Sequence, residues 1–144
     1  MSTQSAVGLG VPRKIDNADA EQVVRHVEMF YFAAAVAKGD FIVSDLAETT
    51  YGLGAAAKES TTTADEPCLG VAAQAVAAGE WGPVVTYGVA TTASLGGSVA
   101  AGDALATGTT AGQAVTAANT DVNVVGYALE DDTANVGAVF VQCR

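Results

Sequence analysis

The stretch LGVAAQAVAAGEWGPVVTYG, residues 69–88, decides the fold, because it holds two apolar runs separated by small residues and a Gly-Glu pair. Apolar runs that are rich in Val and bounded by Gly are typical of short β-strands joined by turns. A similar pattern, VVGYALEDDTANVGAVFVQ, returns at residues 124–142. We therefore expect both stretches to fold as pairs of strands built on one plan.

A second pair of matching segments strengthens this internal repeat. VAKGDFIVSD, residues 36–45, is echoed by VAAGDALATG, residues 99–108. In both segments a Gly-Asp turn leads into a short run that favours a strand. Each half of the chain thus offers a turn-led strand, a variable loop and then two further strands, and the sequence predicts an internal pseudo-repeat.

Short strands are expected along the rest of the chain, each bounded by Gly, Asn or Asp. Their ranges are 41–43, 69–76, 83–88, 89–95, 103–107, 113–117, 123–129 and 136–142. Strands of this length at close and regular spacing indicate an all-β fold, a small β-barrel or sandwich. Residues 47–67 are small, polar and interrupted by Gly, which predicts a long loop.

The length of 144 residues fits a single domain. Residues 1–16 are rich in Ser and Gly and predict an extended, flexible N-terminal arm, followed by a single β-rich domain at residues 17–144. Residues 19–38 admit two interpretations. Val23, Val27 and Phe30 recur at helical spacing, whereas Val, Met, Phe and Tyr side chains in close succession favour a strand. We favour the strand and keep the helix open.

The charge and composition argue against several classes of function. The formal net charge is −10, and after Lys58 no Lys or Arg occurs before Arg144. A protein that binds nucleic acid directly needs a basic surface that displaces counterions from phosphate, so we expect no DNA or RNA binding. No apolar run reaches the roughly 18 residues that a membrane span requires. Much of the apolar composition is alanine, and such a thin core predicts association with other copies of the chain.

The residues that could carry chemistry are few and isolated. His26 is the only histidine, and no nucleophile or orienting group accompanies it, so we expect no enzyme, no cofactor and no metal site. The acidic run at residues 130–132 lacks the alternating acids of a calcium-binding loop and predicts a solvated hairpin tip. Cys68 and Cys143 lack metal-ligand spacing and are expected to be reduced, buried thiols.

Five segments, taken in order, carry a family resemblance. They are the Gly-Asp-led strand at residues 39–43, LGVAAQAVAAGEWGPVVTYGVA, AAGDALAT, GTTAGQAVTAAN and VVGYALEDDTANVGAVFVQ. In this order the chain resembles the bacteriophage capsid cement, or head decoration, proteins of the small β-barrel type, once known only as a domain of unknown function. The resemblance implies a structural protein of the virion, made in the host cytoplasm, that binds the outer surface of an icosahedral capsid and bridges capsomers. It also implies the major capsid protein as partner and a homo-oligomer, most commonly a homotrimer.

Two groups of residues are candidate contact sites. The N-terminal arm is expected to become ordered on the capsid through backbone pairing and a charge contact. The residues expected to touch the capsid are Val7, Leu9, Val11, Pro12, Arg13 and Lys14. The aromatic run Phe30, Tyr31 and Phe32 is a candidate subunit interface, or else it fills the core of the monomer.

The alternative function is a head fibre or adhesion module in which the loop at residues 47–67 contacts host glycans. Binding of the purified protein to a glycan array, without affinity for empty heads, would favour it. A small hydrolase or lyase is a third hypothesis, disfavoured because His26 lacks catalytic partners.

Overall fold

The described part of the chain is built of β-strands joined by turns and loops. The computed structural model describes residues 25–61, 67–118 and 123–143. Within these ranges the strands are β1 (Arg25–Phe32), β2 (Phe41–Ser44), β3 (Ala56–Glu59), β4 (Cys68–Ala72), β5 (Glu80–Ser94), β6 (Ala104–Thr107), β7 (Ala114–Thr116), β8 (Gly126–Ala128) and β9 (Val136–Gln142). The expected all-β fold is therefore confirmed, and the described residues contain no helix that could span a membrane.

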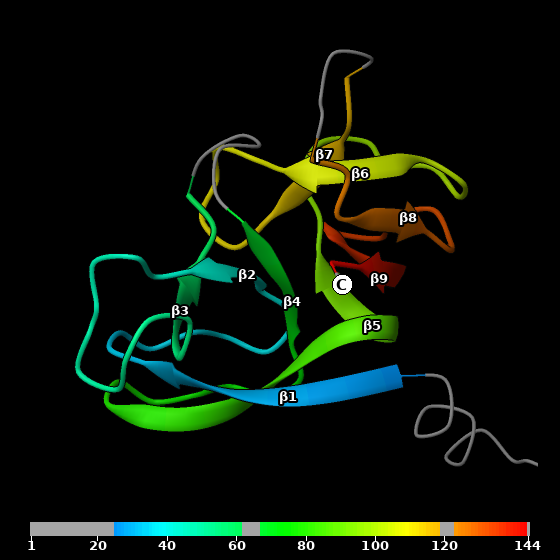
Figure 1. The fold of residues 1–144 in the computed structure, drawn as a ribbon. Coiled ribbons are helices and arrows are strands. Elements are labelled where there is room, and N and C mark those ends of the chain that lie inside the picture. The colour runs from blue at the N-terminus through cyan, green and yellow to red at the C-terminus, as the bar shows by residue number, and fades with distance from the viewer. Residues whose placement is uncertain (1–24, 62–66, 119–122, 144) are drawn as a thin grey trace, which may run out of the picture.

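Five of the strands close into a small barrel. The hydrogen-bonded order is β1-β3-β2-β4-β5-β9-β8-β6-β7, and an additional pairing of β1 with β5 closes the first five strands into a ring (Figure 1). Strands β1 and β3 are parallel, and the other paired strands are antiparallel. We call the first five strands the barrel. The last four, which continue from the C-terminal part of β5, we call the second sheet.

Strand β5 belongs to both parts of the molecule. Its N-terminal residues pair with β1 and β4, and its C-terminal residues pair with β9. The sequence predicted two strands, at 83–88 and 89–95, but the chain runs through as one strand of 15 residues. Gly88, with a φ of 103°, lies at the junction and pairs with both Arg25 and Val141. Because glycine has no Cβ, it adopts this left-handed backbone without strain, and the strand bends instead of ending.

Two hydrophobic cores lie on opposite faces of β2 and β4. Successive side chains of a strand project to opposite faces. Ile42 and Ala72 therefore pack inside the barrel with Phe32, whereas Phe41 and Val71 pack between the barrel and the second sheet. All five side chains are at most 2% exposed. Because both faces of β2 and β4 are buried, their sequences read as continuous apolar runs and not as alternating ones.

The internal repeat predicted from the sequence is present in the strand pairing. Strands β2, β4 and the beginning of β5 are arranged as β6, β8 and β9 are. Ile42 pairs with Gly70 in the first half, and Leu105 pairs with Gly126 in the second. Strand β3 lies beside β2 in the same way that β7 lies beside β6. Matching segments of the sequence thus occupy matching positions in the fold.

The Gly-Asp turns repeat as well. The carboxylate of Asp40 accepts a hydrogen bond from the N–H of Ala37 at 2.8 Å, and that of Asp103 accepts one from Ala100 at 3.0 Å. The glycines that precede the two aspartates have φ values of 93° and 89°. Each turn is therefore held by the same carboxylate contact, and each delivers the chain into the first strand of its half.

The segment at residues 47–67 is not the uninterrupted loop that the sequence predicted. Strand β3 lies within it, pairs parallel with β1 and antiparallel with β2, and so closes the barrel. Its sequence, Ala-Ala-Lys-Glu, has little intrinsic preference for a strand, so the strand depends on its two neighbours. Ala57 is the register partner of Phe32, and its small side chain leaves space for that ring in the barrel core.

The ambiguous segment at residues 19–38 is resolved for its described part. Residues 25–32 form strand β1, as favoured, and Val36 makes an isolated antiparallel bridge with Val76. Residues 1–24, which include the predicted arm, lie outside the described residues.

Candidate functional site

Three aromatic rings meet on the outside of the barrel. Tyr31 of β1 and Trp81 of β5 are register partners in adjacent strands, so their side chains lie on the same face. Tyr51, from the segment between β2 and β3, packs against both. Its ring centroid lies 4.6 Å from that of Tyr31 and 5.3 Å from that of Trp81. Tyr51 is 55% exposed and Trp81 is 45% exposed. We call Tyr31, Tyr51 and Trp81 the barrel cluster.

The burial of Phe30 and Phe32 corrects the predicted subunit interface for these two residues and agrees with the alternative, that the aromatic run fills the core of the monomer. Phe30 and Phe32 are buried in the barrel core. They alternate with Tyr31 along β1 and therefore point to the opposite face of the strand. Their side chains are not available to a partner. Tyr31 alone of the predicted trio reaches the surface, and its aromatic neighbours come from distant parts of the sequence.

A second group of aromatic side chains lies across three neighbouring strands. Tyr87 of β5 and Phe140 of β9 make an edge-to-face contact with ring centroids 5.2 Å apart. Tyr127 of β8 is the register partner of Phe140 and shares its face of the sheet. Tyr87 and Tyr127 are 46% and 43% exposed. We call Tyr87, Tyr127 and Phe140 the sheet cluster, and its position on the outer face is set by the same strand alternation.

Both clusters are surfaces suited to binding. Tyrosine and tryptophan combine a large apolar area with a polar group and few rotatable bonds, which is why they are enriched in protein interfaces. The sequence analysis missed five of these six residues, because each is a single aromatic with no other aromatic beside it in the sequence. The signal that was available is strand alternation, which places Trp81 on the face of β5 opposite Val84, and Val84 packs inside the barrel.

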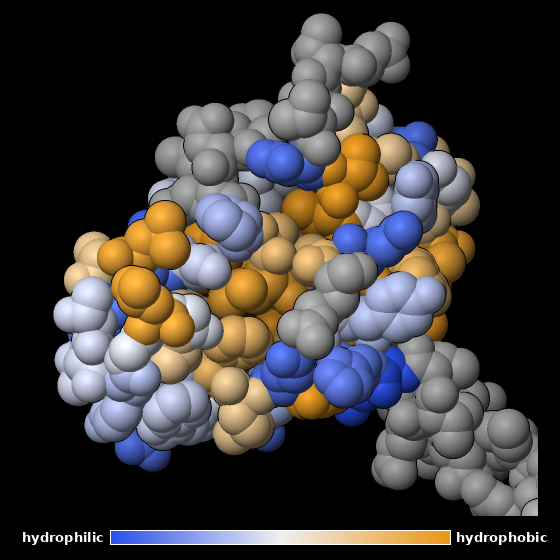
Figure 2. Space-filling view, viewed as in Figure 1, coloured by the Kyte–Doolittle hydropathy of each residue, from blue (hydrophilic) through white to orange (hydrophobic). Residues whose placement is uncertain are grey.

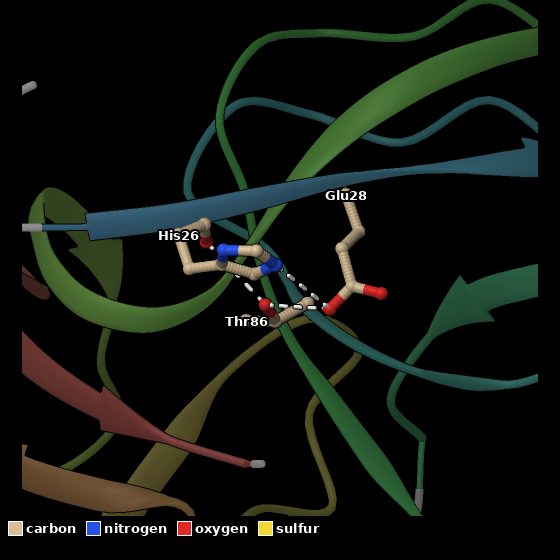
Figure 3. A network of polar contacts seen from close by, with 3 residues as sticks. All are labelled: His26, Glu28 and Thr86. Carbon is tan, nitrogen blue, oxygen red and sulfur yellow. Dashed lines mark hydrogen bonds and ion pairs between the residues drawn. The ribbon is translucent and has the colours of Figure 1, made fainter.

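His26 lies in a small polar network with Glu28 and Thr86 (Figure 3). The Nε2 atom of His26 is 3.6 Å from Oε2 of Glu28, and the Thr86 hydroxyl donates a hydrogen bond to the same oxygen at 2.9 Å. In a catalytic triad the hydroxyl donates to the imidazole, which in turn is oriented by the carboxylate. Here both the hydroxyl and the imidazole point to the carboxylate, and Thr86 is only 1% exposed. The network ties β1 to β5 and has no nucleophile-to-base contact.

The acidic run at residues 130–132 is engaged in the turns of the second sheet. Glu130 accepts a hydrogen bond from the N–H of Ala138 at 2.9 Å, across the tip of the β8–β9 hairpin. Asp131 and Asp132 accept hydrogen bonds from the backbone of the neighbouring turn at residues 99–103, at 2.9 and 3.0 Å. The carboxylates thus brace two loops against each other, a role that the predicted solvated tip did not include.

Asp40 is a buried acid at the boundary between the barrel and the second sheet. Its burial raises the pKa of the carboxyl above the usual range, and hydrogen bonds with Ala37 and Ser94 offset part of that rise. A methyl group on Gly112 would lie 2.6 Å from the Asp40 carboxylate, so the second half of the chain packs directly on this side chain. Asp40 therefore belongs to the packing of the two halves and not to an exposed site.

The predicted capsid-contact residues at positions 7–14 lie outside the described residues, so their assignment stays a prediction. Among the described residues, the two aromatic clusters are the candidate contact surfaces that we consider. The two clusters are formed by different strands and different parts of β5.

The architecture is that of a small closed β-barrel continued by a repeat-related sheet. No family model matches the chain, and no curated protein matches it. Among solved structures, the chain is similar to the N base of head fiber gp8.5 in bacteriophage phi29, with a TM-score of 0.54 and 21% sequence identity. The match covers 83% of this chain and 95% of that chain. The shared architecture extends over both the barrel and the second sheet and supports the fold described above.

Proposed function

We propose that this chain is a structural protein of the bacteriophage head, located in the virion on the outer surface of the capsid. The observation that carries the proposal is the likeness to the N base of a phage head fiber over 83% of the chain. The ordered motifs of the head decoration proteins, spread over residues 36–142, point to the same class independently of that comparison. We assign the chain no catalytic activity and no cofactor.

A protein that bridges capsomers needs at least two separate contact surfaces. The barrel cluster and the sheet cluster fit this requirement, since each exposes aromatic side chains and they share β5 only through different parts of that strand. We assign the barrel cluster to contacts between copies in a homo-oligomer, a homotrimer in our proposal, and the sheet cluster to the major capsid protein. Contacts that are individually weak then add through effective concentration.

The charge of the chain agrees with an external position. A net charge of −10 repels nucleic acid and favours partner surfaces that carry Lys and Arg. We therefore propose that the chain contacts capsid protein and neither the packaged DNA nor a membrane.

The first experiment measures binding to purified heads that lack this protein. The double variant Tyr87→Ser/Tyr127→Ser removes two exposed rings of the sheet cluster, and we expect an apparent affinity for heads at least about 10-fold lower, with the oligomeric state unchanged. Leu46→Ser is the matched control, because Leu46 is 67% exposed and belongs to neither cluster. Cosedimentation with heads measures the affinity. If the double variant binds as tightly as the control, the assignment of the sheet cluster is wrong; if the unaltered chain does not bind heads, the function is wrong.

The second experiment measures self-association by analytical ultracentrifugation. We expect Trp81→Ala to shift the chain towards monomer at concentrations where the unaltered chain is oligomeric, because this ring contributes exposed apolar area to the barrel cluster. An unaltered chain that is monomeric throughout the concentration range would contradict the proposed oligomer.

The N-terminal arm is assigned to the capsid as well. Deletion of residues 2–14 is expected to abolish head binding and to leave self-association intact, because the arm adds backbone pairing and the charges of Arg13 and Lys14. Unchanged decoration of expanded heads by the shortened chain would exclude this role.

A second candidate function is that of a head fibre or host-glycan adhesion module. The observation that favours it is the position of Tyr51, which lies in the 47–67 segment and joins Tyr31 and Trp81 in one exposed group of rings. Binding to a glycan array that is lost in Trp81→Ala would decide for this second function. Head binding without glycan binding would decide for the capsid protein.

A further inference from the structure

The two cysteines of the chain meet in the fold. Cys68 is the first residue of β4 in the barrel, and Cys143 follows the last residue of β9 in the second sheet. They are 75 positions apart in sequence, yet their Sγ atoms lie 3.0 Å apart. Both are free thiols in this structure.

The pair lies at the edge of the core, beside the surface of the molecule. Both side chains are half-buried and pack against the edge of the core between the barrel and the second sheet. The Sγ of Cys143 also lies 3.5 Å from the carbonyl oxygen of Val125. A surface pocket opens beside the pair, and both cysteines line it together with Pro67, Asn123, Val124, Val125 and Gln142. Figure 2 shows hydrophobic residues gathered in the middle of the face it presents, between the two parts of the molecule.

We propose that Cys68 and Cys143 form an intramolecular disulfide bond when the protein is exposed to a small-molecule disulfide. This bond links the end of β9 covalently to the barrel. The sulfur atoms of a disulfide bond lie about 2 Å apart, so bond formation requires the two Sγ atoms to approach each other by only about 1 Å. The two strand ends therefore need little rearrangement. The inference does not rest on the proposed function.

The reaction is thiol–disulfide exchange in two steps. The hydrogen bond with Cys143, together with burial, raises the pKa of Cys68 well above its usual value. We assign the first attack to Cys143, which follows the last residue of β9 and lines the surface pocket. The thiolate of Cys143 attacks one sulfur of the small disulfide, forms a mixed disulfide and releases one small thiolate. Cys68 then loses its proton, attacks the sulfur of Cys143 and releases the second small thiolate. Two protein thiols are oxidised, the small disulfide is reduced to two thiols, and these take up the two protons.

The position of the bond gives it a mechanical role. Among the described strands, β4 and β9 are not register partners, and β5 is the barrel strand that pairs with a strand of the second sheet. Gly112 of the second half also exchanges backbone hydrogen bonds with Phe41 and Ser60. The disulfide would add a second covalent route between the barrel and the second sheet and would enclose the whole chain from β4 to β9. A cross-link that closes so long a loop reduces the freedom of the unfolded chain and raises stability.

The experiment uses the full chain, reduced, purified and then incubated with oxidised glutathione at neutral pH. We expect the intact mass to fall by about 2 Da, the mass of two hydrogen atoms, with no thiol left for alkylation. Cleavage after glutamate, at Glu59, Glu80 and Glu130, should give one cross-linked species that joins the peptide ending at Glu80 to the peptide beginning at Asp131. Thermal unfolding should shift upwards by about 5–15 °C, and dithiothreitol should reverse the shift.

Two variants separate the disulfide from other effects of the oxidant. Cys143→Ser should show no upward shift, whether or not its Cys68 takes up a glutathione adduct, and Cys68→Ser/Cys143→Ser should be unaffected by glutathione. Two thiols of the unaltered chain that remain alkylatable after oxidation would overturn the proposal. A stable glutathione adduct or a disulfide-linked dimer of the unaltered chain would also overturn it. Because the decisive mass measurement is made on the unaltered chain, it holds even if a variant fails to fold.

Discussion

A methyl group on Gly126 would lie 2.2 Å from the carbonyl oxygen of Phe140, and one on Gly70 would lie 1.9 Å from that of Val85. The two glycines occupy the same position in the two repeats, where the strand lies close to the backbone of the next strand in the sheet. The repeated glycine in LGVA and VGYA is therefore required by the backbone itself. Any side chain at either position has to push two paired strands apart.

This contact predicts the effect of Gly126→Ala. We expect a loss of about 3 kcal/mol or more in the free energy of unfolding, measured by urea denaturation, because the added methyl group meets backbone that cannot move aside freely. Gly79→Ala is the matched control, since a methyl group there meets nothing within 4 Å. Only the left-handed backbone of Gly79 opposes that change, and it costs about 1 kcal/mol. Equal losses in the two variants would contradict the steric argument.

Asp40 makes a residue-level prediction about pH. Burial raises the pKa of its carboxyl above the ordinary value. The stability that Asp40 contributes is therefore fully present below the unfolded pKa of about 3.9 and is lost as the pH rises through the higher folded pKa. In Asp40→Asn the side chain does not ionise and keeps an oxygen for the N–H of Ala37. We expect the melting temperature of the unaltered chain, relative to that of Asp40→Asn, to fall between pH 3 and pH 7.

Thermal unfolding over that pH range tests the expectation. Asp103→Asn serves as the matched control, since Asp103 makes the same turn contact with Ala100 in the second repeat but in an exposed turn. A melting temperature of the unaltered chain that stays level with Asp40→Asn, or rises above it, as the pH increases would exclude the burial of a charged carboxyl as a destabilising factor.

At the scale of the elements, strands bounded by turn residues were predictable and strands defined by their neighbours were not. The sequence located β2, β4, β6, β7, β8 and β9 to within a few residues, because Gly, Asn and Asp mark their ends. It missed β3, whose alanines carry no strand preference and which exists because β1 and β2 leave a gap between them. It divided β5 at Gly88, because a glycine commonly ends a strand. Here the glycine bends the strand, and the strand continues beyond it.

The candidate site was less predictable than the fold. The run of three aromatics at residues 30–32 indicated either a surface or a core. Side-chain alternation along β1 places Phe30 and Phe32 in the core and Tyr31 at the surface. Tyr31 acquires its partners only through the register with Trp81 and the path of the segment that holds Tyr51. Neither can be derived from spacing in the sequence, since both contacts join residues that are far apart in it.

The alternation of buried and exposed side chains along β1 predicts different outcomes for substitutions at Phe32 and Tyr31. The Phe32 ring is fully buried in the barrel core. Phe32→Ala should lower the free energy of unfolding by about 3–5 kcal/mol, because loss of the ring leaves a cavity. Tyr31→Ala should cost about 1 kcal/mol or less and should instead weaken self-association. Chemical denaturation and analytical ultracentrifugation of the two variants measure these effects. A large loss of stability in Tyr31→Ala would place that ring in the core.

At the scale of the whole molecule, the barrel and the second sheet are expected to unfold together. They share β5, and Phe41, Val71 and Val85 of the barrel strands belong to the same core as Leu105 and Val139 of the second sheet. Separating the parts would expose that core. Differential scanning calorimetry should therefore show one transition whose calorimetric and van't Hoff enthalpies agree. Two resolved transitions would show that the repeats are independent units.

The short length of β7 affects how readily the protein aggregates at high local concentration. It is the last strand in the hydrogen-bonded order and has only three residues, and the carbonyl oxygen of Ala114 on it already accepts a bond from the N–H of Gly96 at 2.8 Å. An exposed edge strand is a template to which further chains can add by backbone hydrogen bonding, as in amyloid. Because β7 is short and partly paired, neighbouring copies of this protein find few free backbone groups on it from which a fibril could nucleate.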